Sequence, residues 1–170
     1  MVGRLTRLRS LNNMSTTTKI PKLSTLIKGR KFDWVDSDIT DTLFETPKEI
    51  GTDFRLFHFN RYISSDDAIK EMEKEGYRPA NAWELLEWKD ANEYDSVITL
   101  GSVGLVEGIQ HVVVLRRVGA WQLLGLISRV GAWGAHGRFL AVRNSSLGTS
   151  KSEPTHRCPE CNASITITLS

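Results

Sequence analysis

The chain has 170 residues, a length that suits one domain with loose ends, because a single core typically serves about 100–150 residues. Hydrophobic residues make up 40% and charged residues 25%, which is the composition of an ordinary soluble globular protein. No run of about 18 apolar residues occurs, which excludes a membrane-spanning helix. The net charge of +2 is too small to indicate nucleic-acid binding by itself.

The charges are distributed unevenly along the chain. Residues 1–32 carry basic side chains and no acidic one, whereas residues 33–107 hold nearly all the carboxylates. Residues 108–152 again contain no Asp or Glu. Such a long acid-free stretch inside a folded domain is unusual and needs an explanation.

The N-terminal segment, residues 1–31, is basic and rich in Ser and Thr. It lacks the continuous apolar core of a secretory signal, although its composition also resembles a transit peptide. We expect a disordered arm here and, with no signal peptide or membrane span, a cytoplasmic location by default.

The C-terminal segment, residues 145–170, has the composition of a flexible linker and tail. It contains both cysteines, Cys158 and Cys161, in a CxxC arrangement with His156 just before them. Two such turns supply four thiolates to a zinc ion, but the second turn is missing. Cys158 and Cys161 are therefore only a weak metal-site candidate, and we expect no cofactor.

Between these ends, the first regular element is predicted as a strand at residues 54–59, where aromatic and apolar residues alternate. The preceding residues 32–52 have no clean period and are expected to be irregular, with a few aromatic anchors. A helix is predicted after Ser64 and Ser65, either of which can cap it, and Gly76 is expected to end it in a left-handed conformation. A second helix follows, with Asn81 as its cap and apolar packing residues that include Trp83 and Leu85.

The pattern then changes to β structure. Strands are predicted at residues 96–100, 111–115, 121–126 and 138–142, and the β-branched run at 111–115 indicates burial on both faces. One strand, two helices and several short strands predict an α+β fold with two helices and a small antiparallel sheet. The expected domain covers residues 32–144.

No enzyme mechanism can be assembled from the sequence. His58, His111 and His136 are scattered without ligand spacing, and no phosphate-binding or nucleophile motif occurs. The helix carboxylates Glu84 and Glu87 are expected to be solvated. We therefore expect that the protein is not an enzyme.

Basic and aromatic residues interleave near the C-terminal end of the domain, as in Arg116, Arg117 and Trp121 or in Trp133 and Arg138. Such a pattern can hold single-stranded nucleic acid. The apolar residues around Trp133 already define a buried face, so the core interpretation is favoured and nucleic acid is not the expected partner.

Residues 117–138 form an acid-free run that also lacks Asn, Asp, Pro and Lys, which turns normally use. Leu124, Leu126 and Trp133 stand as fixed apolar positions, and small or apolar residues fill the gaps between them. The residues between these fixed positions therefore resemble surface residues whose identity is not constrained by packing.

At these positions the chain resembles the variable proteins of diversity-generating retroelements, which have a C-type-lectin fold related to formylglycine-generating enzymes. The shared marks are Gly76-Tyr-Arg-Pro79, Trp83-Glu-Leu-Leu86, Ile98-Thr-Leu-Gly-Ser102 and Leu124-x-Leu126. The most specific mark is Trp133-x-x-x-x-Arg138-Phe-Leu-Ala-Val-Arg143. In this family, mutagenised copies of a template replace the end of the coding region, so that exposed side chains vary on a constant scaffold.

The resemblance implies a C-type-lectin-like domain with a variable region at about residues 116–143. It implies a non-enzymatic function, in which a variable face binds an unknown protein or surface ligand. Arg129 and His136 are expected to be exposed polar contacts of this face. Gln122 is a doubtful member of this face, because residues two apart on a strand point to the same side and Leu124 is expected to point inward. The implied ligand-binding residues are Val118, Gly119, Ala120, Gly125, Ile127, Ser128, Arg129, Val130, Gly134, Ala135, His136 and Gly137.

Two alternatives stay open. One is an enzyme related to the formylglycine-generating, sulfatase-modifying enzymes, although the catalytic cysteines of that family are missing from the domain. The other is a nucleic-acid-binding protein that uses the basic arm and the CxxC tail. The sequence also departs from the variable proteins in one respect, because about a sixth of the chain follows Arg143.

Overall fold

The computed structural model describes residues 19–144. Residues 1–18 and the tail with Cys158 and Cys161 lie outside the described residues. None of the helices in the described part is long and apolar enough to cross a membrane. These helices are α1 (Leu23–Gly29), α2 (Ser65–Lys74), α3 (Ala82–Glu87) and the 3-10 helix η1 (Lys89–Glu93).

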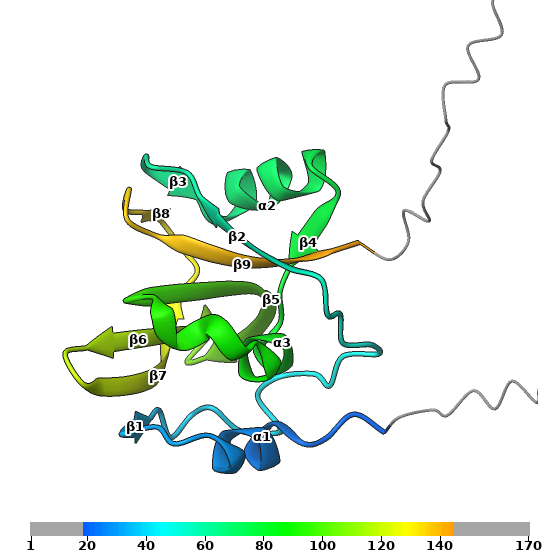
Figure 1. The fold of residues 1–170 in the computed structure, drawn as a ribbon, viewed down its shortest axis with the longest axis vertical. Helices are drawn as coiled ribbons and strands as arrows, with labels where there is room; N and C mark the ends of the chain where they lie inside the picture. The colour runs from blue at the N-terminus through cyan, green and yellow to red at the C-terminus, as the bar shows by residue number, and fades with distance from the viewer. Residues whose placement is uncertain (1–18, 145–170) are drawn as a thin grey trace, which may run out of the picture.

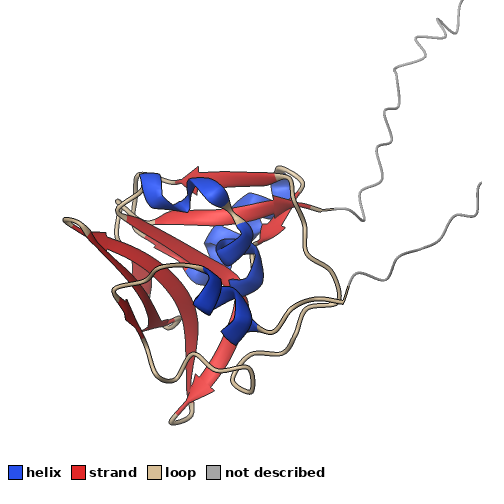
Figure 2. Ribbon diagram, turned by 60° about the horizontal axis from the view of Figure 1, so that its bottom comes forward, coloured by secondary structure: helices blue, strands red, loops and turns tan. Residues whose placement is uncertain are grey.

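Strands contribute more residues to the described chain than helices do (Figures 1 and 2). One mixed sheet of seven strands has the order β1-β7-β6-β5-β9-β2, and β4 also pairs with β9. Strands β3 and β8 form a separate pair. Within the large sheet, β1–β7 and β5–β9 are parallel pairs, and the other pairs are antiparallel. The strands are β1 (Trp34–Val35), β2 (Phe54–His58), β3 (Ile63–Ser64), β4 (Tyr77–Pro79), β5 (Ser96–Val106), β6 (Ile109–Val118), β7 (Trp121–Ser128), β8 (Ala132–Trp133) and β9 (Arg138–Arg143).

The predicted fold class, a C-type-lectin-like α+β fold with two helices and a small antiparallel sheet, is therefore wrong. The described chain has three short α-helices and a seven-stranded mixed sheet. The four strands predicted after residue 95 are too short: β5, for example, continues past Gly101, whose N–H donates to the Ala80 carbonyl at 2.9 Å. Strands β1 and β4 carry no alternation of their own and become strands through pairing with β7 and β9.

The large sheet separates two cores. On one side, here called the α3 face, Leu115, Leu124 and Leu140 pack with residues of α1 and α3. On the other side, the α2 face, Val114 and Phe139 pack with residues of α2. Figure 1 shows α2 on one side of β9 and α1 and α3 on the other. The two helical layers explain why β6 is buried on both faces, as the β-branched run predicted.

The helix ends confirm the predicted caps. The Ser64 hydroxyl accepts the N–H of Asp67 at 3.1 Å, and Gly76 follows α2 with a φ of 81°. Asn81 begins α3 and accepts the N–H of Glu84 at 2.9 Å, while the Glu84 carboxylate accepts the N–H of Asn81 at 2.9 Å. This reciprocal arrangement is a capping box.

Glu84 is not a solvated helix charge, as had been expected, but a buried one. Its side chain is fully inaccessible, and it forms hydrogen bonds of 2.6 and 2.9 Å with the Arg78 guanidinium. It also accepts the N–H of Gly51 at 2.7 Å. The hydrogen bonds with Glu84 raise the pKa of Arg78 above its ordinary value, against the opposing effect of burial. Glu84 thus joins α3, β4 and the segment before β2.

Helix α1 lies inside the segment expected to be a disordered arm, so the expectation is wrong for residues 19–31. Leu23 is fully buried in the α3-face core, and the carbonyl of Pro21 accepts the indole N–H of Trp83 at 2.9 Å. The Asp41 carboxylate accepts both the N–H and the hydroxyl of Ser24. The weak local pattern of this helix is compensated by these tertiary contacts.

Candidate binding surface

The predicted variable positions are carried by the β6–β7 hairpin and by the chain that leads from it to β9. In register, Val118 pairs with Trp121 at the turn, and His111 pairs with Ser128 at the other end. Seven residues of strand separate these ends, which corresponds to roughly 23 Å. The positions therefore form three groups and not one compact cluster.

The first group is the turn of the hairpin, called here the tip: Val118, Gly119 and Ala120. All three residues are exposed, and Val118 is 62% accessible. Gly119 has a φ of 61°, which L side chains rarely adopt. Trp121 lies opposite Val118 and is also 62% accessible, so the end of the hairpin presents apolar side chains to solvent.

The second group lies along β7 and comprises Gly125 and Ile127 on the α2 face and Ser128 on the α3 face. Side chains alternate along a strand, and Leu124 points into the α3-face core, so Gly125 and Ile127 point to the opposite face. Ile127 packs against the α2-face core, and a Cβ on Gly125 would lie 3.5 Å from Cζ3 of Trp34. Both positions are half-buried, in contrast to the tip. By the same alternation, Ser128 belongs to the α3 face.

A hollow of about 250 Å³ opens on the α2 face around Gly125 and Ile127. Helix α2 covers the β9 side of this face, and the hollow lies on the β7 side beside Trp34, which is 50% accessible. No sequence pattern marked Trp34 as a site residue, because β1 has only two residues and its pairing is set by distant β7. The hollow is lined by Trp34, Asp36, Val114, Arg116, Leu123, Gly125, Leu126 and Ile127.

The third group lies in the loops on either side of β8, which are held by main-chain atoms. The carbonyl of Arg129 accepts the Ser65 hydroxyl at 2.9 Å, and the Ser65 oxygen accepts the indole N–H of Trp133 at 2.8 Å. The carbonyl of Ala135 lies 2.9 Å from Nε2 of His58. Because these contacts use carbonyls of the loop, they do not depend on its side chains.

Side chains in the third group differ in exposure. Val130, Gly134 and His136 are exposed, and Ala135 and Gly137 are half-buried. A Cβ on Gly134 would meet nothing within 4 Å, whereas one on Gly137 would lie 3.2 Å from the Gly134 carbonyl oxygen. Only part of this group is therefore open surface.

Arg129 does not have the exposed, available side chain that had been expected. Its side chain is only 23% accessible, and its guanidinium contacts Asp66 at 2.7 Å and Gln110 at 3.1 Å. It connects the first turn of α2 with the hairpin. His136, in contrast, is exposed as expected.

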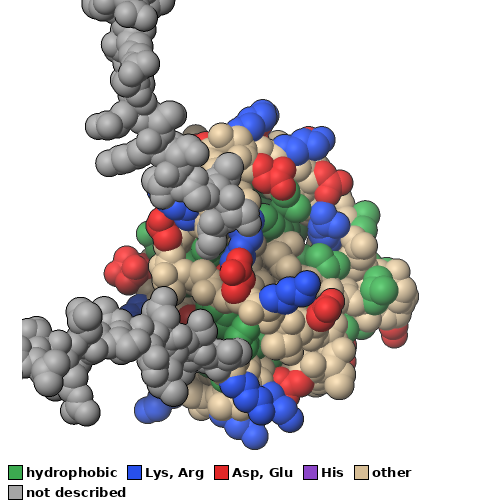
Figure 3. Space-filling model, turned by 90° about the vertical axis from the view of Figure 1, so that its right-hand side faces the viewer, with side chains coloured by type: hydrophobic (Ala, Val, Ile, Leu, Met, Phe, Trp, Pro, Cys, Tyr) green, Lys and Arg blue, Asp and Glu red, His purple; other side chains and the backbone are tan. Residues whose placement is uncertain are grey.

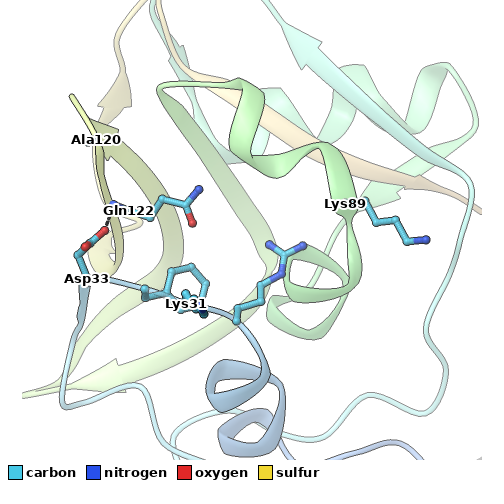
Figure 4. A pocket seen from close by; sticks show the side chains of 7 residues that line it. Lys31, Asp33, Lys89, Ala120 and Gln122 are labelled. Atoms are coloured by element: carbon cyan, nitrogen blue, oxygen red, sulfur yellow. Dashed lines mark hydrogen bonds between the residues drawn. The ribbon is translucent and has the colours of Figure 1, made fainter.

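A second hollow, of about 550 Å³, lies between the hairpin and the chain that follows α1 (Figure 4). Its wall is fixed by Asp33, whose N–H donates to the Gln122 carbonyl at 2.9 Å and whose carboxylate accepts the Gln122 N–H at 2.7 Å. Figure 4 shows the Gln122 amide directed into the hollow and the Lys89 side chain pointing away from it. The lining residues are Arg30, Lys31, Phe32, Asp33, Lys89, Ala120 and Gln122.

Arg30 carries the charge at the base of this second hollow. One terminal nitrogen of its guanidinium donates to the Trp88 carbonyl, and the other, Nη1, is buried and has no hydrogen-bond partner within the described chain. Burial lowers the pKa of Arg30 below its ordinary value, and the nearby Glu87 carboxylate opposes this effect. A buried donor without an acceptor destabilises the side chain in this position.

No catalytic arrangement emerges from residues 19–144. Within this range, no three His, Cys, Asp or Glu side chains lie together as metal ligands. His58 and His111 contact main-chain carbonyls of Ala135 and Ile109, respectively. The lack of enzymatic activity stays a prediction.

Comparison with known proteins adds no relative to this description. No family model, no curated protein and no solved structure matches the chain.

Proposed function

We propose that the chain is a non-enzymatic binding protein whose exposed C-terminal residues are diversified by retroelement mutagenesis. The proposal rests on the sequence motifs and on the local structure around the gap positions, and it does not require the C-type-lectin fold. The observation that supports it most is that the loops on either side of β8 are held by hydrogen bonds to their main-chain carbonyls.

These loops are anchored by residues outside the variable set. Ser65 and His58 contact the carbonyls of Arg129 and Ala135, and Trp133 completes the contact with Ser65. A side chain can change at Val130 or Gly134 without removing any of these hydrogen bonds. Such an arrangement favours tolerance to substitution, which a diversified surface requires.

The size of the surface favours a macromolecular partner. The tip and the loops around β8 lie at opposite ends of a hairpin that is roughly 23 Å long. The α2-face hollow at Gly125 lies between them. A protein or an extended surface ligand can contact all three groups at once, whereas a small molecule can occupy only one hollow.

The genetic test is to sequence the DNA that flanks the gene. The proposal predicts a reverse transcriptase gene and a near-identical repeat of the coding segment for residues 116–143 that is rich in Asn codons. Complete flanking DNA with no such repeat would refute the retroelement part of the proposal.

The biochemical test concerns tolerance at the exposed positions. Libraries that randomise Val130, Gly134 and His136 are expected to yield mostly folded proteins, as measured by thermal unfolding of individual clones. A matched library at the buried positions Leu124, Trp133 and Phe139 is the control and is expected to yield mostly unfolded chains. Equal losses of folded protein in both libraries would contradict the proposal.

A further inference from the structure

Strand β2 lies at one end of the seven-stranded sheet, where it pairs with β9 on one side only (Figure 1). The N–H of Arg143 donates to the Asp53 carbonyl at 2.9 Å, and in an antiparallel pair every second residue from there bonds to the partner strand. The main-chain groups of Arg55 and Phe57 therefore point to β9. Those that point away from the sheet belong to Phe54, Leu56 and His58.

The outward-pointing groups of β2 have no hydrogen-bond partner within residues 19–144. On β9, the residue opposite Leu56 is Leu140, whose carbonyl accepts the N–H of Ala80 at 2.9 Å on the far side of β9. This bond agrees with a main chain of Leu56 that β9 does not use. The free N–H groups and carbonyls of β2 thus form a row along the edge of the sheet, and such a row is a template for a further strand.

Edge strands usually have features that block further pairing, such as short length, Lys, Pro or a bulge. Strand β1, at the other end of the sheet, has only two residues and lies between Asp33 and Asp36. Strand β2 has five residues, contains no Lys, Pro or Gly, and pairs with β9 without a register shift. Its one charged residue, Arg55, forms an ion pair with Glu75 and lies 4.6 Å from the ring centroid of Phe57. Strand β2 is therefore able to accept another strand.

We propose that β2 pairs with β2 of a second copy of the chain, antiparallel about a two-fold axis at Leu56. In this register Leu56 opposes Leu56 of the second copy, and Phe54 opposes His58. Each outward N–H then meets an outward carbonyl, and the two sheets join into one. Phe54 and Leu56 are only half-buried in the single chain, so the pairing would also cover more of their apolar surface.

The charges around β2 favour a second copy as the occupant. Residues 51–61 contain three charged side chains, which are Asp53, Arg55 and Arg61. In the two-fold register these residues oppose, in the same order, Phe59, Phe57 and Gly51 of the second copy. No like charges therefore oppose each other across the axis, although directly opposed like charges would weaken such pairing.

A neighbouring face of the molecule lacks a comparable surface. Figure 3 shows the right-hand side of Figure 1, where Lys and Arg side chains lie among Asp and Glu and hydrophobic side chains appear only in small patches. That face offers no broad apolar surface for self-association. The pairing through β2 uses none of the implied ligand-binding residues, so it does not depend on the retroelement proposal.

The first experiment uses the unmodified full chain. Sedimentation equilibrium over a range of concentrations is expected to show a monomer–dimer equilibrium, and main-chain hydrogen exchange is followed by NMR at both ends of that range. The amides of Phe54, Leu56 and His58 are expected to exchange about tenfold more slowly, or slower still, in the dimer. Those of Arg55 and Phe57 are expected to be protected in both states, because they bond to β9.

The second experiment tests the two-fold axis with charge variants. Leu56→Lys sets two like charges opposite each other and is expected to weaken association by at least about tenfold, and Leu56→Glu is expected to do the same. An equimolar mixture of the two variants is expected to form dimers again, because opposite charges then meet at the axis. The control variant Leu105→Lys adds a charge on β5 at a side chain that is 65% accessible, and it is expected to associate like the unmodified chain.

Thermal unfolding of each variant checks that it is folded, and the exchange experiment tests the proposal even if a variant is not. A chain that stays monomeric at every concentration would overturn the proposal, as would a dimer in which the amide of Leu56 is unprotected. Protection of that amide in a monomer would overturn it and assign the edge to another segment of the same chain. Folded variants that fail to associate when mixed would exclude pairing about Leu56. None of these outcomes affects the retroelement proposal, which the flanking DNA tests separately.

Discussion

Two glycines of β5 and two glycines of the predicted variable positions differ in what surrounds them. A Cβ on Gly101 of β5 would lie 2.6 Å from the Pro79 carbonyl oxygen, and one on Gly104 would lie 2.6 Å from Cγ of Leu43. A Cβ on Gly119 or Gly134 would meet nothing within 4 Å. Packing therefore requires glycine at Gly101 and Gly104, whereas at Gly134 neither space nor backbone conformation requires it.

The ion pairs also differ between the scaffold, where Glu84 is buried, and the predicted variable positions, where Arg129 pairs with an exposed Asp66. Removing the buried pair has the largest expected effect on stability. Glu84→Ala removes a fully buried carboxylate and leaves Arg78 and the N–H of Gly51 without their acceptor. We expect a loss of about 3–5 kcal/mol in the free energy of unfolding, measured by urea denaturation. The control is Asp66→Ala, which breaks the pair with Arg129 and is expected to cost less than about 1 kcal/mol, because Asp66 is largely exposed. Similar losses of unfolding free energy in both variants would contradict this difference between the buried and the exposed ion pair.

Gly101→Ala tests the glycines directly. The added methyl group would overlap main-chain atoms of Pro79 and Ala80, which cannot move without shifting β4 against β5. We expect a destabilisation of about 3 kcal/mol by urea denaturation. The matched variant Gly134→Ala is expected to change stability by no more than about 0.5 kcal/mol. A large loss at Gly134 would mean that this loop is packed more closely than its open surroundings indicate.

Ser65→Ala examines how the scaffold holds the loops. The substitution removes the hydroxyl that joins the Arg129 carbonyl to the Trp133 indole, and the indole N–H is buried. We expect a loss of about 2 kcal/mol, measured by thermal unfolding. Faster proteolysis between β7 and β9 should accompany it. The exposed neighbour Asp66 supplies a control site, and an unchanged proteolysis pattern in Ser65→Ala would show that the loop is held by other contacts.

Gly119→Val gives the smallest expected effect, because only the backbone opposes it. With a φ of 61° at this position, a non-glycine residue costs about 1 kcal/mol even though space is open. Gly119→Asn is expected to cost less, since Asn tolerates the left-handed conformation. Thermal unfolding of the two variants measures the difference. Equal stabilities would indicate that the turn adopts another conformation once glycine is replaced.

Local signals in the sequence predicted the elements that depend on neighbours along the chain. The cap at Ser64, the end of α2 at Gly76 and the cap at Asn81 all follow from hydrogen bonds within a few residues. The doubly buried β6 followed from its run of Val. These predictions succeeded because their physical causes are local.

Predictions failed where distant segments decide the structure. Nothing near Trp34 indicates a strand, because its pairing with Leu123 depends on residues far along the chain. The sequence around Glu84 is typical of a solvated charge on a helix. Its burial is favourable only because Arg78 and the N–H of Gly51 form hydrogen bonds with its carboxylate. The expected exposure of Arg129 was wrong for a similar reason: its partner Asp66 is distant in sequence, and their contact could not be deduced from the sequence. The sheet was underestimated because tertiary pairing overrides weak strand propensity.

The position of β9 has a consequence for how errors in this gene would be filtered. β9 lies between β5 and β2 inside the sheet, although it is the last strand of the described chain. A copy with a stop codon or a shifted reading frame before Arg138 would lack this inner strand and would leave β5 and β2 without a partner on that side. Such truncated products would stay unfolded and be open to proteases. Folded protein is therefore expected only from copies of the gene that encode a complete β9, whatever residues stand at positions 116–137.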